Sequence, residues 1–182
     1  MTAVRAEATE VKTNSKGAAP YIPLNELWCL SWPERTVKPL LQAKWTVQNA
    51  QFSPDGQWVA YASNETGNME IYVSPFPGAK SKWQVSTAGG QEPKWRQDIK
   101  ELFYVSAEGK MMSVEKKTGA NFEAGSQVAL FQTHRRRPIS TLDVFSYDVS
   151  GDGQRFLIAT KGDEGAAAPL SIFLNWASDM EK

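Results

Sequence analysis

The chain lacks several features that identify common classes of enzymes and membrane proteins. Among its 182 residues it has one cysteine, Cys29, and one histidine, His134, so the sequence predicts neither an internal disulfide nor a zinc site. No stretch reaches the roughly 20 apolar residues of a membrane span, and residues 1–20 do not resemble a signal peptide. Twenty basic residues balance 20 acidic residues, so bulk charge favours neither nucleic acid nor anionic membrane. We therefore expect partners to be recognised locally.

Catalytic motifs are also missing from the sequence. A protein kinase needs a Gly-rich loop, a strand Lys and an Asp-bearing catalytic loop, and GDGQRF (151–156) lacks the third glycine of such a loop. A serine hydrolase needs a nucleophile elbow and a histidine base, but there is no G-x-S-x-G segment and His134 stands in an HRRRP run. We therefore predict that the chain is not an enzyme, and that it has no cofactor and no metal site.

What the sequence does contain is a repeat of short apolar segments. DGQWVAYAS (55–63) aligns with DIKELFYVS (98–106) and DGQRFLIAT (152–160), whose first residues are 43 and then 54 positions apart. ELWCLSWP (26–33) aligns with EIYVSPFP (70–77) at an offset of 44. A period of roughly 40 to 45 residues built from short strands is typical of propeller blades. Together with the 11% aromatic content and the absence of helical periodicity, it predicts an all-β fold.

Each strand pair of the repeat is introduced by a turn. In SPDG (53–56), Pro54 sets the backbone of a turn, Asp55 can bond the nearby backbone, and Gly56 can take the left-handed conformation. Ile99 occupies the glycine position of the second repeat, and a β-branched residue with positive φ is an outlier, so we expect a different turn there. The residues with an expected turn-forming role are Pro54, Asp55, Gly56, Asp98, Asp152 and Gly153. The three aspartates belong to separate repeats, which favours turn formation over calcium binding.

The spacing predicts a partial propeller of antiparallel blades with strands a to d from the axis outward. We expect a disordered leader (1–21), a partial propeller over 22–178 and a tail (179–182). Within the propeller we expect a c–d half blade (26–42), complete blades (45–86 and 93–132) and a three-stranded last blade (146–176). Thirteen strands cannot close the usual ring, so the open arc leaves blade faces and an edge strand unpaired. The chain is therefore expected to form a homodimer or to require further blades upstream, with most of its seven tryptophans in the core.

Antiparallel blades place the b–c loops and the d–a links on one face, opposite the SPDG-type turns. A basic cluster lies in the long link before the last blade, and Trp45 lies in an earlier d–a link. Because variable loops on a rigid scaffold carry function, we predict that this face binds a protein or small ligand through His134, Arg135, Arg136, Arg137 and Trp45. A short charged run can also be a solvated loop, and a third interpretation is salt-dependent binding of nucleic acid by the basic cluster.

The segment SPDGQWVAYASNETGNMEIYV (53–73) resembles the TolB-type, WD-repeat-like propeller repeat. With PFPG, KWQVSTAGG, EPKW, ELFYVS and LNW, residues 22–178 resemble the C-terminal propeller of bacterial eukaryotic-type serine/threonine kinases. The resemblance implies a non-catalytic binding or sensing region in a periplasmic or other extracytoplasmic location. Because prolyl-oligopeptidase-type serine peptidases share the repeat, the alternative is a gating propeller separated from its hydrolase domain.

Overall fold

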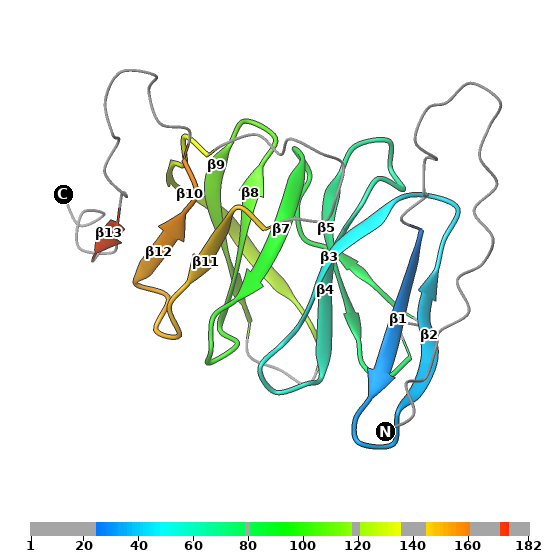
Figure 1. The fold of residues 1–182 in the computed structure, drawn as a ribbon. Coiled ribbons are helices and arrows are strands. Elements are labelled where there is room, and N and C mark those ends of the chain that lie inside the picture. Colours follow the sequence, from blue (N-terminus) through cyan, green and yellow to red (C-terminus); the bar gives the residue numbers. More distant parts are fainter. Residues whose placement is uncertain (1–24, 79–80, 118–120, 136–144, 161–171, 175–182) are drawn as a thin grey trace, which may run out of the picture.

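The computed structural model describes residues 25–78, 81–117, 121–135, 145–160 and 172–174; the expected leader and tail lie outside them. The described residues form thirteen strands in four antiparallel sheets, with no helix (Figure 1). The sheets are β1 (Glu26–Ser31) and β2 (Thr36–Gln42); β3 (Val47–Phe52), β4 (Trp58–Ser63), β5 (Glu70–Pro75) and β6 (Trp83–Gln84); β7 (Gly90–Trp95), β8 (Glu101–Ser106), β9 (Lys110–Lys116) and β10 (Ala124–Gln132); and β11 (Tyr147–Val149), β12 (Arg155–Ile158) and β13 (Ile172–Leu174). The all-β, partial-propeller prediction is confirmed.

The sheets pack face to face along the chain because their middle strands are apolar on both sides. Every residue of β4 is buried, and its alternate side chains enter two different cores. Trp58, Ala60 and Ala62 face the β7–β10 sheet, whereas Val59 and Tyr61 face the β1–β2 sheet. A third core lies between the β7–β10 and β11–β13 sheets. Its centre is an edge-on contact between Phe103 and Phe156, with ring centroids 5.1 Å apart.

The turn between β7 and β8 has the same conformation as its glycine-containing counterparts, so the prediction of a different turn there is wrong. The Ile99 amide donates to the Arg96 carbonyl at 2.9 Å, as the Gly56 amide donates to the Ser53 carbonyl at 2.8 Å. Ile99 has a φ of 59°, close to the 69° of Gly56. The β-branched residue therefore occupies the left-handed region.

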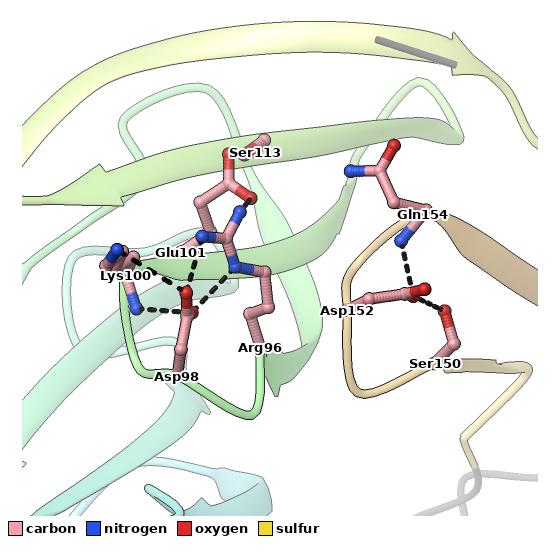
Figure 2. A network of polar contacts seen from close by, with 8 residues as sticks. All are labelled: Arg96, Asp98, Lys100, Glu101, Ser113, Ser150, Asp152 and Gln154. Carbon is pink, nitrogen blue, oxygen red and sulfur yellow. Dashed lines mark hydrogen bonds and ion pairs between the residues drawn. The ribbon is translucent and has the colours of Figure 1, made fainter. Parts of the chain in front are cut away.

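This turn contains a close arginine–carboxylate pair between Arg96 and Asp98. The Arg96 guanidinium donates from Nε to Asp98 Oδ1 at 2.6 Å and from Nη2 to Oδ2 at 2.7 Å (Figure 2). Asp98 Oδ1 also accepts the Lys100 amide at 3.1 Å. In the β11–β12 turn a serine hydroxyl, from Ser150, donates to Asp152 instead. A bidentate pair between arginine and carboxylate fixes geometry strongly, and here it accompanies the unfavourable φ of Ile99.

Two tryptophans expected in the core are instead exposed, because no described sheet covers the outer face of β1–β2. Trp28 is 54% exposed and Trp32 is 71% exposed. Tyr72, which occupies the position of Trp28 one repeat later, is only 2% exposed, because it packs against the preceding sheet.

Candidate binding site on the loop-rich face

The β4–β5 and β8–β9 loops and the β2–β3 and β6–β7 links lie on one side of the arc, which we call the loop-rich face (Figure 1). The β3–β4, β7–β8 and β11–β12 turns lie along the opposite edge (Figure 1). This follows from the antiparallel order of the strands in each sheet. The loop-rich face therefore collects the segments whose lengths vary most between the repeats.

A cavity of about 440 Å³ opens between the second and third sheets on the loop-rich face. Its walls are residues 68–69 of the β4–β5 loop, 88–91 at the start of β7, 106–107 of the β8–β9 loop, and Arg135. The volume falls in the range of roughly 300 to 1,000 Å³ that small-molecule sites occupy. Amide, hydroxyl and guanidinium groups share the wall with Met69 and small apolar residues, a mixture suited to a polar ligand that keeps some apolar surface.

Arg135 is held in place by an ion pair and by backbone and side-chain contacts. Its guanidinium forms an ion pair with Glu92, and its side chain is 14% exposed against 3% for Glu92. Arg135 Nη2 also approaches Gln91 Oε1 at 3.5 Å, and the Arg135 backbone bridges to Thr160. An arginine paired in this way keeps its guanidinium in a fixed position, unlike a mobile arginine on the surface.

The second carboxylate oxygen of Glu92 accepts hydrogen bonds from the segment that leads into β11. Glu92 Oε2 accepts the Ser146 amide at 2.6 Å and the Ser146 hydroxyl at 2.7 Å. The Tyr147 hydroxyl donates to the Glu92 carbonyl at 2.8 Å. Burial, followed by the Glu92 carboxylate, raises the pKa of Tyr147 well above its usual value, so this hydroxyl stays protonated. The network couples the third and fourth sheets beside the cavity.

A second buried carboxylate supports the opposite wall. The Glu70 side chain accepts the Gly89 amide at 2.9 Å and the Ser86 hydroxyl, and Ser86 Oγ accepts the Ile71 amide at 2.8 Å. Gly89 has a φ of 86°, and a Cβ there would lie 2.6 Å from the Ala107 Cβ. The two walls therefore meet at a position that only glycine fits.

Of the residues predicted to bind, only some lie at the cavity. Arg135 lines the cavity, and neighbouring His134 is exposed with a φ of 46°. Arg136 and Arg137 lie outside the described residues. Trp45 does not line the cavity; its ring lies 5.3 Å from Lys82 Nζ, and Lys82 forms an ion pair with Glu65.

The turn side of the molecule carries a second, more polar cavity of about 330 Å³, lined by Arg96, Glu101, Ser113 and Val128 among others. Arg96 Nη1 donates to Glu101 Oε2 at 2.6 Å, and Ser113 Oγ donates to Glu101 Oε1 at 3.2 Å. Figure 2 shows these groups beside the β11–β12 turn. The Arg96 guanidinium lowers the pKa of Asp98 to about 2. Two of the charged groups here, Arg96 and Glu101, are already paired with each other.

Two searches of the described residues gave negative results. No three or more histidine, cysteine, aspartate or glutamate side chains gather there as a metal-binding group. The same residues contain no helix with the length and apolarity that a membrane crossing requires.

Sequence reasoning missed Glu70 and Glu92, the two buried carboxylates that fix the cavity. Glu70 aligns with Glu26 in the repeat, but only Glu70 is buried, at 3% exposure. Glu92 precedes Pro93 and aligns with Asn49 of the previous repeat; both have positive φ and both are buried. The sequence signal that could have identified Glu92 is that Asn49 and Glu92, two polar residues, occupy the same repeat position inside a strand.

Comparison with solved structures shows propeller folds. TolB from Acinetobacter baumannii superposes with a TM-score of 0.60 at 22% identity, over 83% of this chain and 35% of the TolB chain. A candidate 6-phosphogluconolactonase from Bacteroides uniformis superposes with a TM-score of 0.50 at 12% identity, over 75% of this chain and 41% of that one. Oligogalacturonate lyase from Vibrio parahaemolyticus gives 0.47 at 15% identity, over 75% and 36%.

The similarity to TolB identifies the fold as that of TolB-like propellers. No protein-family model matches the chain, and no curated protein matches it. The chain spans 35% of the length of the TolB structure and 41% of the lactonase-like one. The role of the whole propeller in those proteins is therefore not transferred to this chain.

Proposed function

We propose that this chain is a non-catalytic propeller module that binds a small ligand or a segment of a protein at its loop-rich face. The observation that carries the proposal is the cavity between the second and third sheets, into which the buried ion pair of Arg135 and Glu92 sets a fixed guanidinium. Ligand sites commonly combine a concave surface with a few convergent polar groups. The cavity walls meet this description without a nucleophile and base placed together.

The finer assignment is a sensing region like the propeller of bacterial serine/threonine kinases, in an extracytoplasmic location. It is supported by the sequence resemblance of residues 22–178 together with the TolB-like fold. In such a role, ligand binding at the loop-rich face would be the input, and catalysis would belong to another domain. Nucleic acid is not the expected partner, because Arg135 is neutralised by Glu92 and the chain has no net charge.

A binding screen with matched variants tests the proposal. The wild-type chain is exposed to acetylated amino acids, short uncharged peptides and monosaccharides, and binding is followed by thermal shift and calorimetry. Ala88→Tyr fills the cavity wall, whereas Thr87→Tyr adds the same ring at an exposed neighbour that does not line it.

The proposal predicts ligands whose affinity falls at least about tenfold in Ala88→Tyr and is unchanged in Thr87→Tyr, since a filled site loses its contacts. Equal effects of the two variants, or no binding by the folded wild-type chain, would contradict it. Turnover of any compound that stops in Ala88→Tyr would instead identify an enzyme.

A further inference from the structure

Within the part of the chain that the structure describes, the first sheet has an unpaired edge at β1. β1 pairs with β2 alone, whereas the other inner strands of the described sheets, such as β4, β5, β8 and β9, have partners on both sides. An exposed strand edge presents free N–H and C=O groups that can pair with another strand. By the repeat, β1 and β2 correspond to strands c and d, so the missing partners are strands a and b.

The same sheet has an uncovered apolar face. Trp28 is 54% exposed and Leu30 is 60% exposed, and the alternation of a strand places them on one face of β1. Val37, which is opposite Leu30 in the register, is 58% exposed. Contiguous exposed apolar residues of this kind mark an interaction surface.

The last sheet has the complementary deficiency. Its described strands are β11, β12 and β13, which correspond to strands a, b and c, whereas the second and third sheets have four strands each. Leu157 of β12 is 54% exposed, whereas Ala60 and Phe103, at the same repeat position, are 0% exposed because the next sheet covers them. The polar cavity that includes Ser113 and Val128 lies open on the face of the third sheet that packs against β12.

We propose that β1–β2 of one copy completes the last sheet of a second copy. β1 takes the edge of β12 that β13 holds in the single chain, which gives a four-stranded sheet in the order β11, β12, partner β1, partner β2. The exchange is reciprocal in a two-fold dimer, the commonest closed symmetry. Each chain then contributes two complete sheets and two half sheets, so two chains close a ring of six sheets, within the usual range of about four to eight blades.

The repeat also gives the register of the shared sheet. Ala60 pairs with Val73, and these positions correspond to Leu157 and Cys29. Leu157 of one copy therefore lies opposite the cysteine at position 29 of the other, where Ile172 pairs in the single chain. In this register the exposed Trp28 and Leu30 face the third sheet and its open cavity. One arrangement thus covers both apolar surfaces and the free edge of β1.

A disulfide test uses the chain's own cysteine. In Leu157→Cys, mild oxidation should link the new thiol to Cys29 of a second copy. Opposite residues on antiparallel strands have Cβ atoms about 4.5 to 5.5 Å apart, near the roughly 3.5 to 4.5 Å of a disulfide, and diagonal neighbours lie about 7 to 8 Å apart. Within one chain, Cys29 and Leu157 belong to the first and last sheets and cannot meet (Figure 1).

Arg155→Cys is the matched control, because Arg155 is exposed, lies on the same face of β12, and is two residues away. We expect a reducible dimer in Leu157→Cys, at a yield at least about tenfold above that of Arg155→Cys. Equal yields would overturn the register. Light scattering on the wild-type chain should give twice the 20.2 kDa of one chain; a monomer at every concentration, or chains that grow with concentration, would overturn the ring.

Discussion

Arg96 lies across Gly153 of the neighbouring sheet. A Cβ at Gly153 would come within 2.6 Å of Arg96 Cδ and 3.3 Å of Phe103 Cζ. The Gln97 amide donates to the Gly151 carbonyl at 3.1 Å in the same region. The β7–β8 and β11–β12 turns are therefore in direct contact, and the Arg96 side chain that orders its own turn also packs against the next one.

The contact predicts a difference between two otherwise similar substitutions. Gly153 and Gly56 have φ values of 73° and 69°, but nothing lies within 4 Å of a Cβ at Gly56. Gly56→Ala should cost about 1 kcal/mol of unfolding free energy for its left-handed backbone alone. Gly153→Ala should cost a further 1 to 3 kcal/mol or so, as overpacking does. Urea denaturation measures both, and equal costs would contradict the turn-to-turn contact.

The left-handed Ile99 predicts a stabilising substitution. Non-glycine residues in this region carry strain of roughly 1 to 2 kcal/mol, and the equivalent positions hold glycine. Ile99→Gly should leave the free energy of unfolding unchanged or raise it by up to about 1 kcal/mol, since lost side-chain packing offsets part of the gain. Ile99→Val keeps the branched side chain and should not stabilise. A loss above about 1 kcal/mol in Ile99→Gly would show that the side chain outweighs the strain.

The buried ion pair beneath the loop-rich cavity predicts a large cost for removing its cation. Arg135→Met leaves Glu92 buried and unpaired, so the unfolding free energy should fall by about 3 to 5 kcal/mol. Combining it with Glu92→Gln removes the buried charge and should recover part of this loss. His134→Ala, at the exposed neighbour, should change stability by less than about 0.5 kcal/mol. If chemical denaturation showed that Arg135→Met lowers the unfolding free energy no more than His134→Ala does, the ion pair of Arg135 and Glu92 would not stabilise the fold.

The turn carboxylate predicts a component of acid denaturation. The Arg96 guanidinium lowers the pKa of Asp98 to about 2, below its ordinary 3.8. A lowered folded-state pKa favours folding above the ordinary pKa, and this contribution is lost as pH falls through the window from about 4 to about 2. Asp98→Asn should therefore be less stable than wild type near neutral pH, with the difference shrinking across that window. A pH-independent difference would exclude the ion pair as its source.

The fold was predictable because each repeat carries its turn and strand signals in short, local segments of sequence. The aligned segments that begin at Asp55, Asp98 and Asp152 supply a turn and a strand that is apolar on both faces, and both signals are readable without tertiary context. The conformation of Ile99 was not predictable from the glycine rule, because that rule treats a β-branched residue with positive φ as an outlier and does not encode the pairing of the Arg96 side chain with Asp98. Exposure of Trp28 also depends on which sheets are present, which a strand pattern does not encode.

The candidate site was predictable only in outline. Strand order predicted the loop-rich face, and the basic cluster included Arg135, which lines the cavity there. The cavity itself depends on Glu70 and Glu92, whose partners lie 19 and 43 residues away at Gly89 and Arg135. Long-range pairing of this kind leaves no spacing signal in one sequence.

The most direct test of the binding account is an amide NMR titration of the wild-type chain with the strongest ligand from the screen. The account predicts that the largest shifts fall on residues 68–69, 88–91 and 106–107 and on Arg135, around the cavity of the loop-rich face. Shifts centred on the turn side, around Arg96 and Ser113, would contradict it.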